Sequence, residues 1–214
     1  MRPLACLAAL VLLTGCNVVI THQPMFTQAD GAGAPVPRPG LWRMELGDAC
    51  KVDETRPLSE WPSCAGGMML GAGTASYYDR NGDTPVFKTE PLILAAGQPI
   101  VGQAKVDVAG DIKLSGDIYA YVGIRPVKLD EAGRFTRFDF WPVQCGPPSK
   151  AGDNFSDHPA AGVKVEPVSA DATASQVGRL CTIDDPAAMR RVAAQSEAWA
   201  PKKGVGRWVR DKAD

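Results

Sequence analysis

Apolar and polar residues alternate along residues 100–108, which is the two-residue period of a β-strand with one buried and one solvated face. Ile100 and the even-numbered residues after it form the apolar face. Val101, Gln103 and Lys105 form the other face, which we expect to be in contact with water. The segment is therefore predicted to be a strand that covers a core with one face only.

Groups of turn-forming residues recur at short intervals after this strand. Two aromatic-rich runs, 118–124 and 134–143, lie between groups of Gly, Asp and Ser residues, and a short strand is expected at 163–168. Short strands joined by tight turns are typical of an antiparallel meander. Because such a sheet must hide its edges, the fold class expected for residues 40–214 is mainly β, an antiparallel barrel or sandwich.

One α-helix is expected near the C-terminus, at about 186–200. Asp185 offers a capping carboxylate, Pro186 suits the first helical position, and Pro201 marks the end. Met189 and Val192 fall on one side, which favours packing against the outside of the β domain. A membrane-surface helix is the alternative, although its apolar face would be mostly small alanine.

The N-terminus combines one basic residue, Arg2, with an apolar run from Leu4 to Leu13. A helix that crosses a bilayer needs about 20 apolar residues, roughly twice the length of this run. The pattern therefore predicts an export signal that is removed, not a membrane-spanning helix.

The run closes on Leu13-Thr14-Gly15-Cys16, which resembles the lipobox of bacterial lipoproteins. The resemblance implies that residues 1–15 are a signal peptide and that Cys16 becomes the acylated first residue of the mature protein. Two or three acyl chains anchor a protein durably, whereas one alone is marginal. In that family an Asp after the Cys favours the inner membrane, so Asn17 favours the outer membrane, with the domain in the periplasm. An ordinary cleaved secretory signal is the alternative.

Residues 16–39 are expected to form a lipid-anchored flexible tether, because 27–40 is rich in Gly, Ala and Pro without an apolar period. A flexible chain of this length would span on the order of 25 Å and let the domain stand off the membrane. The short apolar piece Val18-Val19-Ile20 is the exception, since it could dock on the domain as an edge strand.

Four cysteines remain in the mature chain once the signal is removed and Cys16 carries lipid. An even number in an exported chain predicts disulfides. Of the three possible pairings, Cys50 with Cys64 and Cys145 with Cys181 closes the shortest loops. Metal ligation by these cysteines is not expected, because the chain has no C-x-x-C pair and only two histidines.

A calcium-type loop is one interpretation of residues 79–90, where oxygen-bearing side chains occupy the first, third, fifth and twelfth positions from Asp79 to Glu90. Thr84, however, stands at the sixth position, where such a loop needs Gly. The dipeptide Asn81-Gly82 is typical of a tight hairpin turn. We therefore prefer a hairpin, with calcium binding as the alternative.

Asp153, Asp157 and His158 in the loop after Cys145 would hold a metal only with a further ligand from elsewhere. A solvated loop is the preferred interpretation, and no metal site is predicted.

The tail from Lys202 to Asp214 surrounds Trp208 with basic side chains: Lys202, Lys203, Arg207, Arg210 and Lys212. Such a group would suit a lipid headgroup or another anionic polymer of the envelope. A solvated terminus, or a last strand through residues 206–209, needs no ligand and is preferred.

Catalytic signatures are missing: the sequence contains no G-x-S-x-G, H-E-x-x-H or S-x-x-K motif. A Ser-His-Asp or Cys-His arrangement would rest on His158, because the other histidine lies in the predicted tether. Catalytic residues and cofactors are therefore not predicted. A site built from carboxylates alone would leave little trace in a sequence.

The segment Gly40-Leu41-Trp42, followed by Cys50 and Cys64, resembles the opening of two barrel families. These are the lipocalins and the bacterial metalloproteinase inhibitors related to the alkaline proteinase inhibitor. Both have a Gly-x-Trp first strand, and the inhibitors add a nearby disulfide. The resemblance implies a carrier of a small apolar ligand or a proteinase-inhibitor barrel. A core aromatic at a strand start explains Trp42 without either family.

These patterns together predict a periplasmic lipoprotein that acts as a non-enzymatic binding or envelope-structure module. Its expected partners are the bilayer, through Cys16, and an envelope protein or a small apolar ligand. The formal net charge of −1 argues against nucleic acid as a partner.

Overall fold

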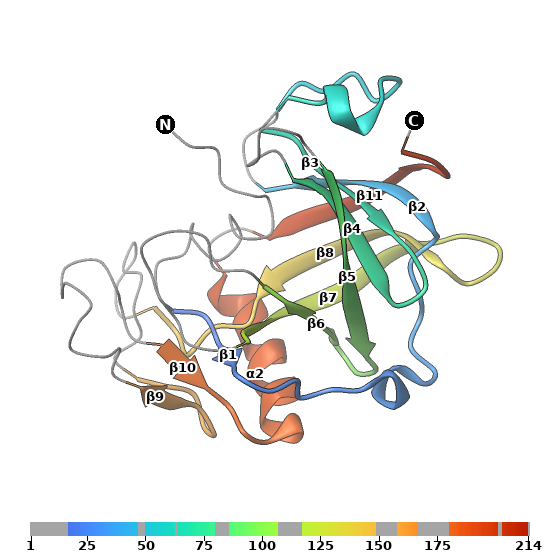
Figure 1. Cartoon of the computed structure of the whole chain (residues 1–214). Coiled ribbons are helices and arrows are strands. Elements are labelled where there is room, and N and C mark those ends of the chain that lie inside the picture. Colours follow the sequence, from blue (N-terminus) through green and yellow to red (C-terminus); the bar gives the residue numbers. More distant parts are fainter. Residues whose placement is uncertain are drawn as a thin grey trace.

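The computed structural model describes residues 17–46, 50–62, 64–79, 86–106, 117–148, 158–166, 180–200 and 203–213 (Figure 1). Cys16, residues 80–85, Asp153, Asp157 and Lys202 lie outside the described residues. The strands are β1 (Ile20–Thr21), β2 (Gly40–Glu45), β3 (Gly66–Leu70), β4 (Thr74–Asp79), β5 (Val86–Ala95), β6 (Ile100–Lys105), β7 (Tyr119–Leu129), β8 (Phe135–Pro142), β9 (Lys164–Glu166), β10 (Leu180–Thr182) and β11 (Gly204–Arg210). The helices are α2 (Pro186–Trp199) and two short 3-10 turns, η1 (Gln28–Gly31) and η2 (Leu58–Glu60).

Eight antiparallel strands close into a barrel. Strands β2 to β8 follow one another around the wall, and β11 lies between β8 and β2. Because β7 pairs with both β6 and β8, the ring is complete and the eight strands have no open edge. The predicted fold class is confirmed as a mainly β protein, and it is a barrel, not a sandwich.

The two ends of the barrel differ in what surrounds them. We call one the hairpin end, because the β7–β8 turn at residues 130–134 projects from it. The opposite end is called the β1 end, because β1 pairs there with Tyr119 and Ala120 at the start of β7. Figure 1 shows β1 and the β7–β8 hairpin on opposite sides of the molecule.

Aromatic side chains fill the interior toward the hairpin end. Trp42 is fully buried, and its ring centroid lies 5.2 Å from that of Phe138 and 5.8 Å from that of Phe135. Gly206 on β11 is directly opposite Phe138, and a Cβ at this glycine would collide with the phenyl ring. The missing side chain therefore lets β11 close the barrel over a large aromatic core.

Helix α2 packs against the outside of the barrel, as predicted. The Asp185 side chain accepts hydrogen bonds from the Ala187 and Ala188 amides, so it caps the helix. Met189 and Val192 are buried. The capping signal and the apolar side of the sequence therefore located this helix correctly.

The prediction of a solvated outer face on β6 is wrong at two positions. Val101 is fully buried and Gln103 is only 2% exposed, whereas Lys105 is exposed as expected. The Gln103 amide accepts hydrogen bonds from the Met25 and Phe26 backbone amides at 2.7 and 2.8 Å and donates to the Phe26 carbonyl at 3.1 Å. The N-terminal segment covers the glutamine and supplies all three hydrogen-bond partners, so the polar side chain can be buried.

The segment predicted as a flexible tether, 16–39, is packed on the barrel from residue 17 onward. Phe26 is 1% exposed, and the Arg190 guanidinium lies 4.6 Å from the centre of its ring. Further along, the Arg38 amide donates to the Phe135 carbonyl at 2.9 Å. These long-range contacts outweigh the conformational freedom that Gly and Pro give the segment, so it forms part of the domain.

Candidate functional site

The first described residues, 17–19, are hydrogen-bonded to residues 143–146 at the β1 end, and we call this contact the junction. Asn17 is 4% exposed, and its side-chain amide donates to the Gly146 carbonyl at 3.1 Å. Its own carbonyl accepts a hydrogen bond from the Cys145 amide at 3.1 Å. The Val19 amide then donates to Val143 at 2.8 Å, immediately before β1 joins β7. The chain is thus fixed to the barrel from residue 17.

The disulfide between Cys145 and Cys181 flanks this junction. Its Cα atoms are 5.8 Å apart, and both cysteines are 2% exposed. Cys145 is hydrogen-bonded to Asn17, while Cys181 forms a parallel bridge with Val19. The predicted pairing is confirmed, and it joins the two segments between which the N-terminal residues lie.

A cavity of about 410 Å³ lies beside the junction, lined by residues 21–25 and 182–184 with Pro186. The Thr21 hydroxyl lies 2.5 Å from the Tyr121 hydroxyl. Burial raises the pKa of Tyr121, and the hydrogen bond with Thr21 partly opposes that rise. The phenol is therefore a neutral structural group at physiological pH.

The inward side chains toward the β1 end of the barrel are less buried than those toward the hairpin end. Leu92, Ala104 and Ala120 form one row of paired residues across β5, β6 and β7, and the next row contains Leu94 and Val122. Leu94 and Val122 pack against the aromatic core, which places this face inside the barrel. All five side chains are only half-buried. Lys88 and Glu90 share this face at the end of β5, so the apolar interior has a polar rim.

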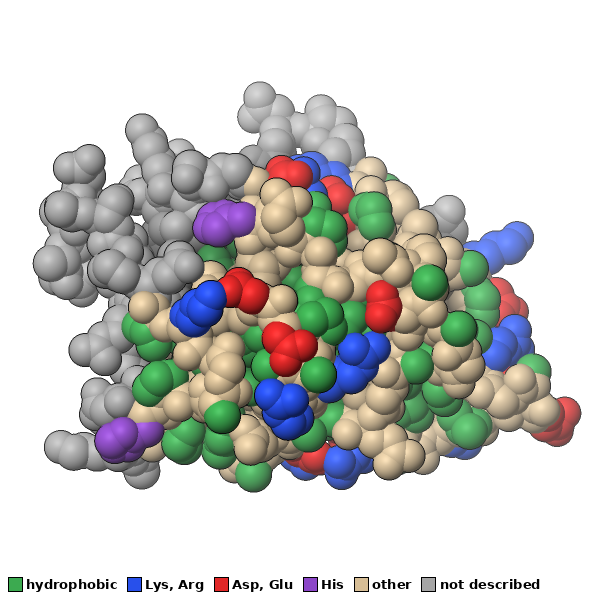
Figure 2. Space-filling view, turned by 90° about the horizontal axis from the view of Figure 1, so that it is seen from below, with side chains coloured by type: hydrophobic (Ala, Val, Ile, Leu, Met, Phe, Trp, Pro, Cys, Tyr) green, Lys and Arg blue, Asp and Glu red, His purple; other side chains and the backbone are tan. Residues whose placement is uncertain are grey.

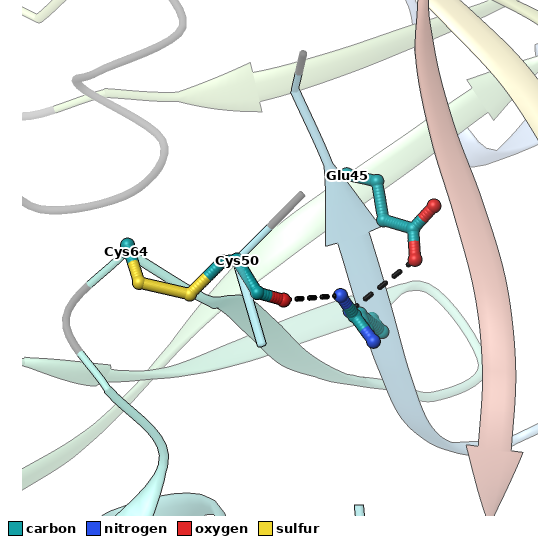
Figure 3. The surroundings of a disulfide bond; sticks show 4 residues. Glu45, Cys50 and Cys64 are labelled. Atoms are coloured by element: carbon teal, nitrogen blue, oxygen red, sulfur yellow. Dashed lines mark hydrogen bonds and ion pairs between the residues drawn. A yellow bond between two sulfur atoms is a disulfide. The ribbon is translucent and has the colours of Figure 1, made fainter. Parts of the chain in front are cut away.

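The second disulfide, Cys50 to Cys64, is also confirmed, with Cα atoms 5.8 Å apart. Residues 50–62 cover the outer wall of β2, β3 and β11, where Leu58 and Trp61 are buried. Arg43 Nη2 donates to the Cys50 carbonyl at 2.7 Å, and Arg43 Nε lies 3.3 Å from Glu45 Oε1. Figure 3 shows Glu45 and the Cys50–Cys64 disulfide in these surroundings. The disulfide and the arginine therefore hold one loop from two directions.

Glu54 is the most perturbed carboxylate of this loop. Hydrogen bonds from Arg207 lower its pKa to about 2 despite an opposing effect of burial, and Arg43 contributes as well. Arg43 Nη1 lies 2.8 Å from Glu54 Oε1, and Arg207 Nη1 lies 2.9 Å from Oε2. Glu45 lies 3.3 Å from Arg43 and 3.8 Å from Arg207, so two carboxylates balance the two arginines and the group fastens the loop.

The basic tail is a strand, as preferred, and its arginines are engaged within the protein. Arg207 binds Glu54, and Arg210 donates to the carbonyls of Arg56 and Ala213 at 2.7 and 2.8 Å. The Arg38 guanidinium lies 3.6 Å from the centre of the Trp208 ring. A protein cation thus occupies the aromatic face that a lipid headgroup would need.

The hairpin interpretation of residues 79–90 is supported by the strand register. Asp79 pairs with Val86, the last and first residues of β4 and β5, while Glu90 pairs with Ala75. Glu90 therefore lies four residues from the turn, about 13 Å along the strand. A calcium loop needs its first and twelfth residues on the same ion, which this register prevents. The Asn81-Gly82 turn itself lies outside the described residues.

Two of the three residues considered for a metal site after Cys145, Asp153 and Asp157, lie outside the described residues. The third, His158, is exposed. Among the residues that the structure does describe, no three His, Cys, Asp or Glu side chains are grouped as metal ligands. The prediction that the site holds no metal remains a prediction.

Trp42 is the third residue of β2, the first strand of the barrel. Gly40 has a φ of 132°, and a Cβ there would clash with the Arg210 carbonyl. The Trp42 indole donates to the Arg38 carbonyl at 2.9 Å while its ring is buried. The core role of this aromatic is therefore confirmed.

Comparisons with known proteins do not assign the chain: no family model matches it, and no curated protein or solved structure gives a significant match. In the described parts of the chain, no helix has the length and apolar character of a membrane span.

Proposed function

We propose that this protein is a lipid-anchored envelope lipoprotein whose barrel acts as a non-enzymatic binding module in the periplasm, most favourably at the outer membrane. The lipobox resemblance at Leu13 to Cys16 is the observation that carries the proposal. Acylation of Cys16 would supply the membrane attachment, and two or three chains would make it durable.

The two disulfides support export, because such bonds persist in oxidising compartments and are rare where thiols are kept reduced. The site chemistry supports a binding role. Glu54, whose pKa is lowered to about 2, forms structural ion pairs, and burial keeps the Tyr121 phenol neutral.

The test is to compare the wild type with Cys16→Ala in intact cells that are supplied with labelled palmitate. We expect the wild type to carry the label and to fractionate with the outer membrane. The variant should be unlabelled, and either soluble or retained as an uncleaved precursor. Equal mature masses and equal fractionation of the two proteins would refute the lipoprotein assignment.

A carrier of a small apolar ligand is the second candidate, and the half-buried interior favours it. Leu92, Ala104 and Val122 face inward yet keep some accessible surface, and the polar rim at Lys88 lies at the same end. An amphiphile with a long apolar chain would match this distribution. A proteinase inhibitor is less favoured, because the described N-terminal segment is bonded to the barrel and does not project as an arm.

The carrier is tested by titrating the protein with a fluorescent long-chain fatty acid. We expect Ala120→Phe, which fills the interior, to abolish saturable binding. Thr89→Phe adds the same ring on the exposed outer face of β5 and should leave binding unchanged. Saturable binding that survives Ala120→Phe, or no binding by any form, would exclude the interior as the site.

A further inference from the structure

The folded domain begins one residue after Cys16. Asn17 is almost completely buried and is bonded to Gly146 through its side chain and to Cys145 through its backbone. Consecutive Cα atoms are separated by about 3.8 Å, so residue 16 is placed within that distance of a fixed point on the barrel. No spacer is left between the residue that carries lipid in the proposed function and the folded protein.

This fixed point is reinforced on both sides. Val18 bridges Gln144 on one side, and Val19 bridges Cys181 on the other. The disulfide from Cys145 to Cys181 joins those two flanking segments covalently. Separating residues 17–19 from the barrel would therefore break backbone pairing on two sides at once, and the junction ties the position of residue 16 to the whole domain.

We propose that the β1 end of the barrel lies directly against the headgroups of the bilayer, held there without a tether. The proposal rests on acylation of Cys16. The hairpin end is then the most distant part, because Leu129 follows Ala120 by nine residues along β7, about 30 Å of strand. The partner surface of the β1 end is thus the lipid headgroup layer itself.

Figure 2 shows the molecule from below the view of Figure 1, and on the described surface of that side basic and acidic side chains are interspersed, with apolar side chains between them. On the β1 end, Lys105 is paired with Asp117 at 2.8 Å. The short covalent link maintains the contact, and it also limits any further partner to molecules on the same bilayer or within about 30 Å of it.

The test uses the acylated full-length protein in phospholipid vesicles that contain a lipid with a quencher on its headgroup. A fluorophore is placed through a noncanonical amino acid at exposed Pro147, next to Gly146, or at exposed Leu129 in a matched protein. A third protein carries the Pro147 label and a Gly/Ser insertion of about 20 residues before Asn17, beginning with Asn so that the residue after Cys16 is unchanged; such a linker spans about 25 Å.

Mass spectrometry first establishes whether each protein is acylated, which tests the proposed function separately. For acylated proteins we expect strong quenching at Pro147, little at Leu129, and a loss of quenching at Pro147 to the Leu129 level after the insertion. Equal quenching at both positions, or quenching at Pro147 that the insertion does not change, would overturn direct apposition even though the anchor is present.

Discussion

The two ends of the barrel are stabilised in different ways. Toward the hairpin end, Trp42, Phe135 and Phe138 stack inside the barrel with ring centroids 5.2 to 5.8 Å apart. Toward the β1 end, the inward side chains are smaller and half-buried, as at Ala104 and Ala120. That end is held from outside, by the N-terminal segment, α2 and the Cys145 to Cys181 disulfide.

This difference shows that one closed sheet can be stabilised from inside at one end and from outside at the other. Large buried aromatics supply the free energy that keeps the ring closed at one end. A disulfide and an outer layer hold the other end, where the inward side chains are smaller and half-buried. The predictions below test this division.

The largest expected effect is at the hairpin end. Trp42→Ala removes a fully buried indole and should lower the free energy of unfolding by about 3–5 kcal/mol. Val122→Ala, at a half-buried interior position, should cost only about 1 kcal/mol. Urea denaturation of both variants measures the contrast. Equal losses would mean that the two ends are packed alike.

Removal of the disulfide at the β1 end should have the next largest effect. Its sequence separation of 36 implies roughly 4 kcal/mol from the chain entropy of the unfolded state. The bond from Cys50 to Cys64 spans 14 residues and should contribute roughly 3 kcal/mol. Hydrogen exchange of Cys145→Ser/Cys181→Ser should show loss of protection concentrated in residues 17–21. Protection lost first in the aromatic half would contradict the role assigned to this disulfide.

The sequence predicted the features that depend on local chemistry. Asp185 and Pro186 located a helix start because capping acts within one turn. The cysteine pairs followed from loop length, and Trp42 from its place at a strand start. Alternation along 100–108 identified β6, although the strand ends at Lys105.

The outer layer could not be predicted, because its partners are distant in sequence. Gln103 is buried by Phe26, which precedes it by 77 residues, and a polar residue at an alternating position normally indicates solvent. Val101 on the same face was a signal that this side also faces a core. The calcium alternative could likewise be rejected only from the strand register. Glu90 pairs with Ala75, and this pairing places Glu90 away from Asp79.

An effect of about 2 kcal/mol is expected from the Glu54 ion pairs on the outer wall. The pKa of Glu54 is about 2 in the folded protein against an ordinary 4.5, so its stabilisation is complete above pH 4.5 and is lost as pH falls toward 2. Its side chain is 26% exposed, which makes the contribution smaller than the full shift implies.

Glu54→Gln should therefore be less stable than the wild type in urea at pH 7, and the difference should shrink at pH 2.5. Glu60→Gln removes an exposed ion pair with Arg56 and serves as the control, with an expected cost below about 1 kcal/mol. A deficit of Glu54→Gln that is the same at both pH values would show that shape, not charge, fastens the loop.

The smallest effect is the sharpest test of the comparison. Ala104→Leu adds volume to the half-buried interior and should change the free energy of unfolding by no more than about 0.5 kcal/mol. Gly206→Val adds volume where a Cβ already collides with Phe138, so overpacking should cost about 1–3 kcal/mol. Both lie on the inner wall, and both are measured by thermal and urea denaturation. If Ala104→Leu costs as much as Gly206→Val, the β1 end is packed to the same density as the hairpin end and has no room for an apolar ligand.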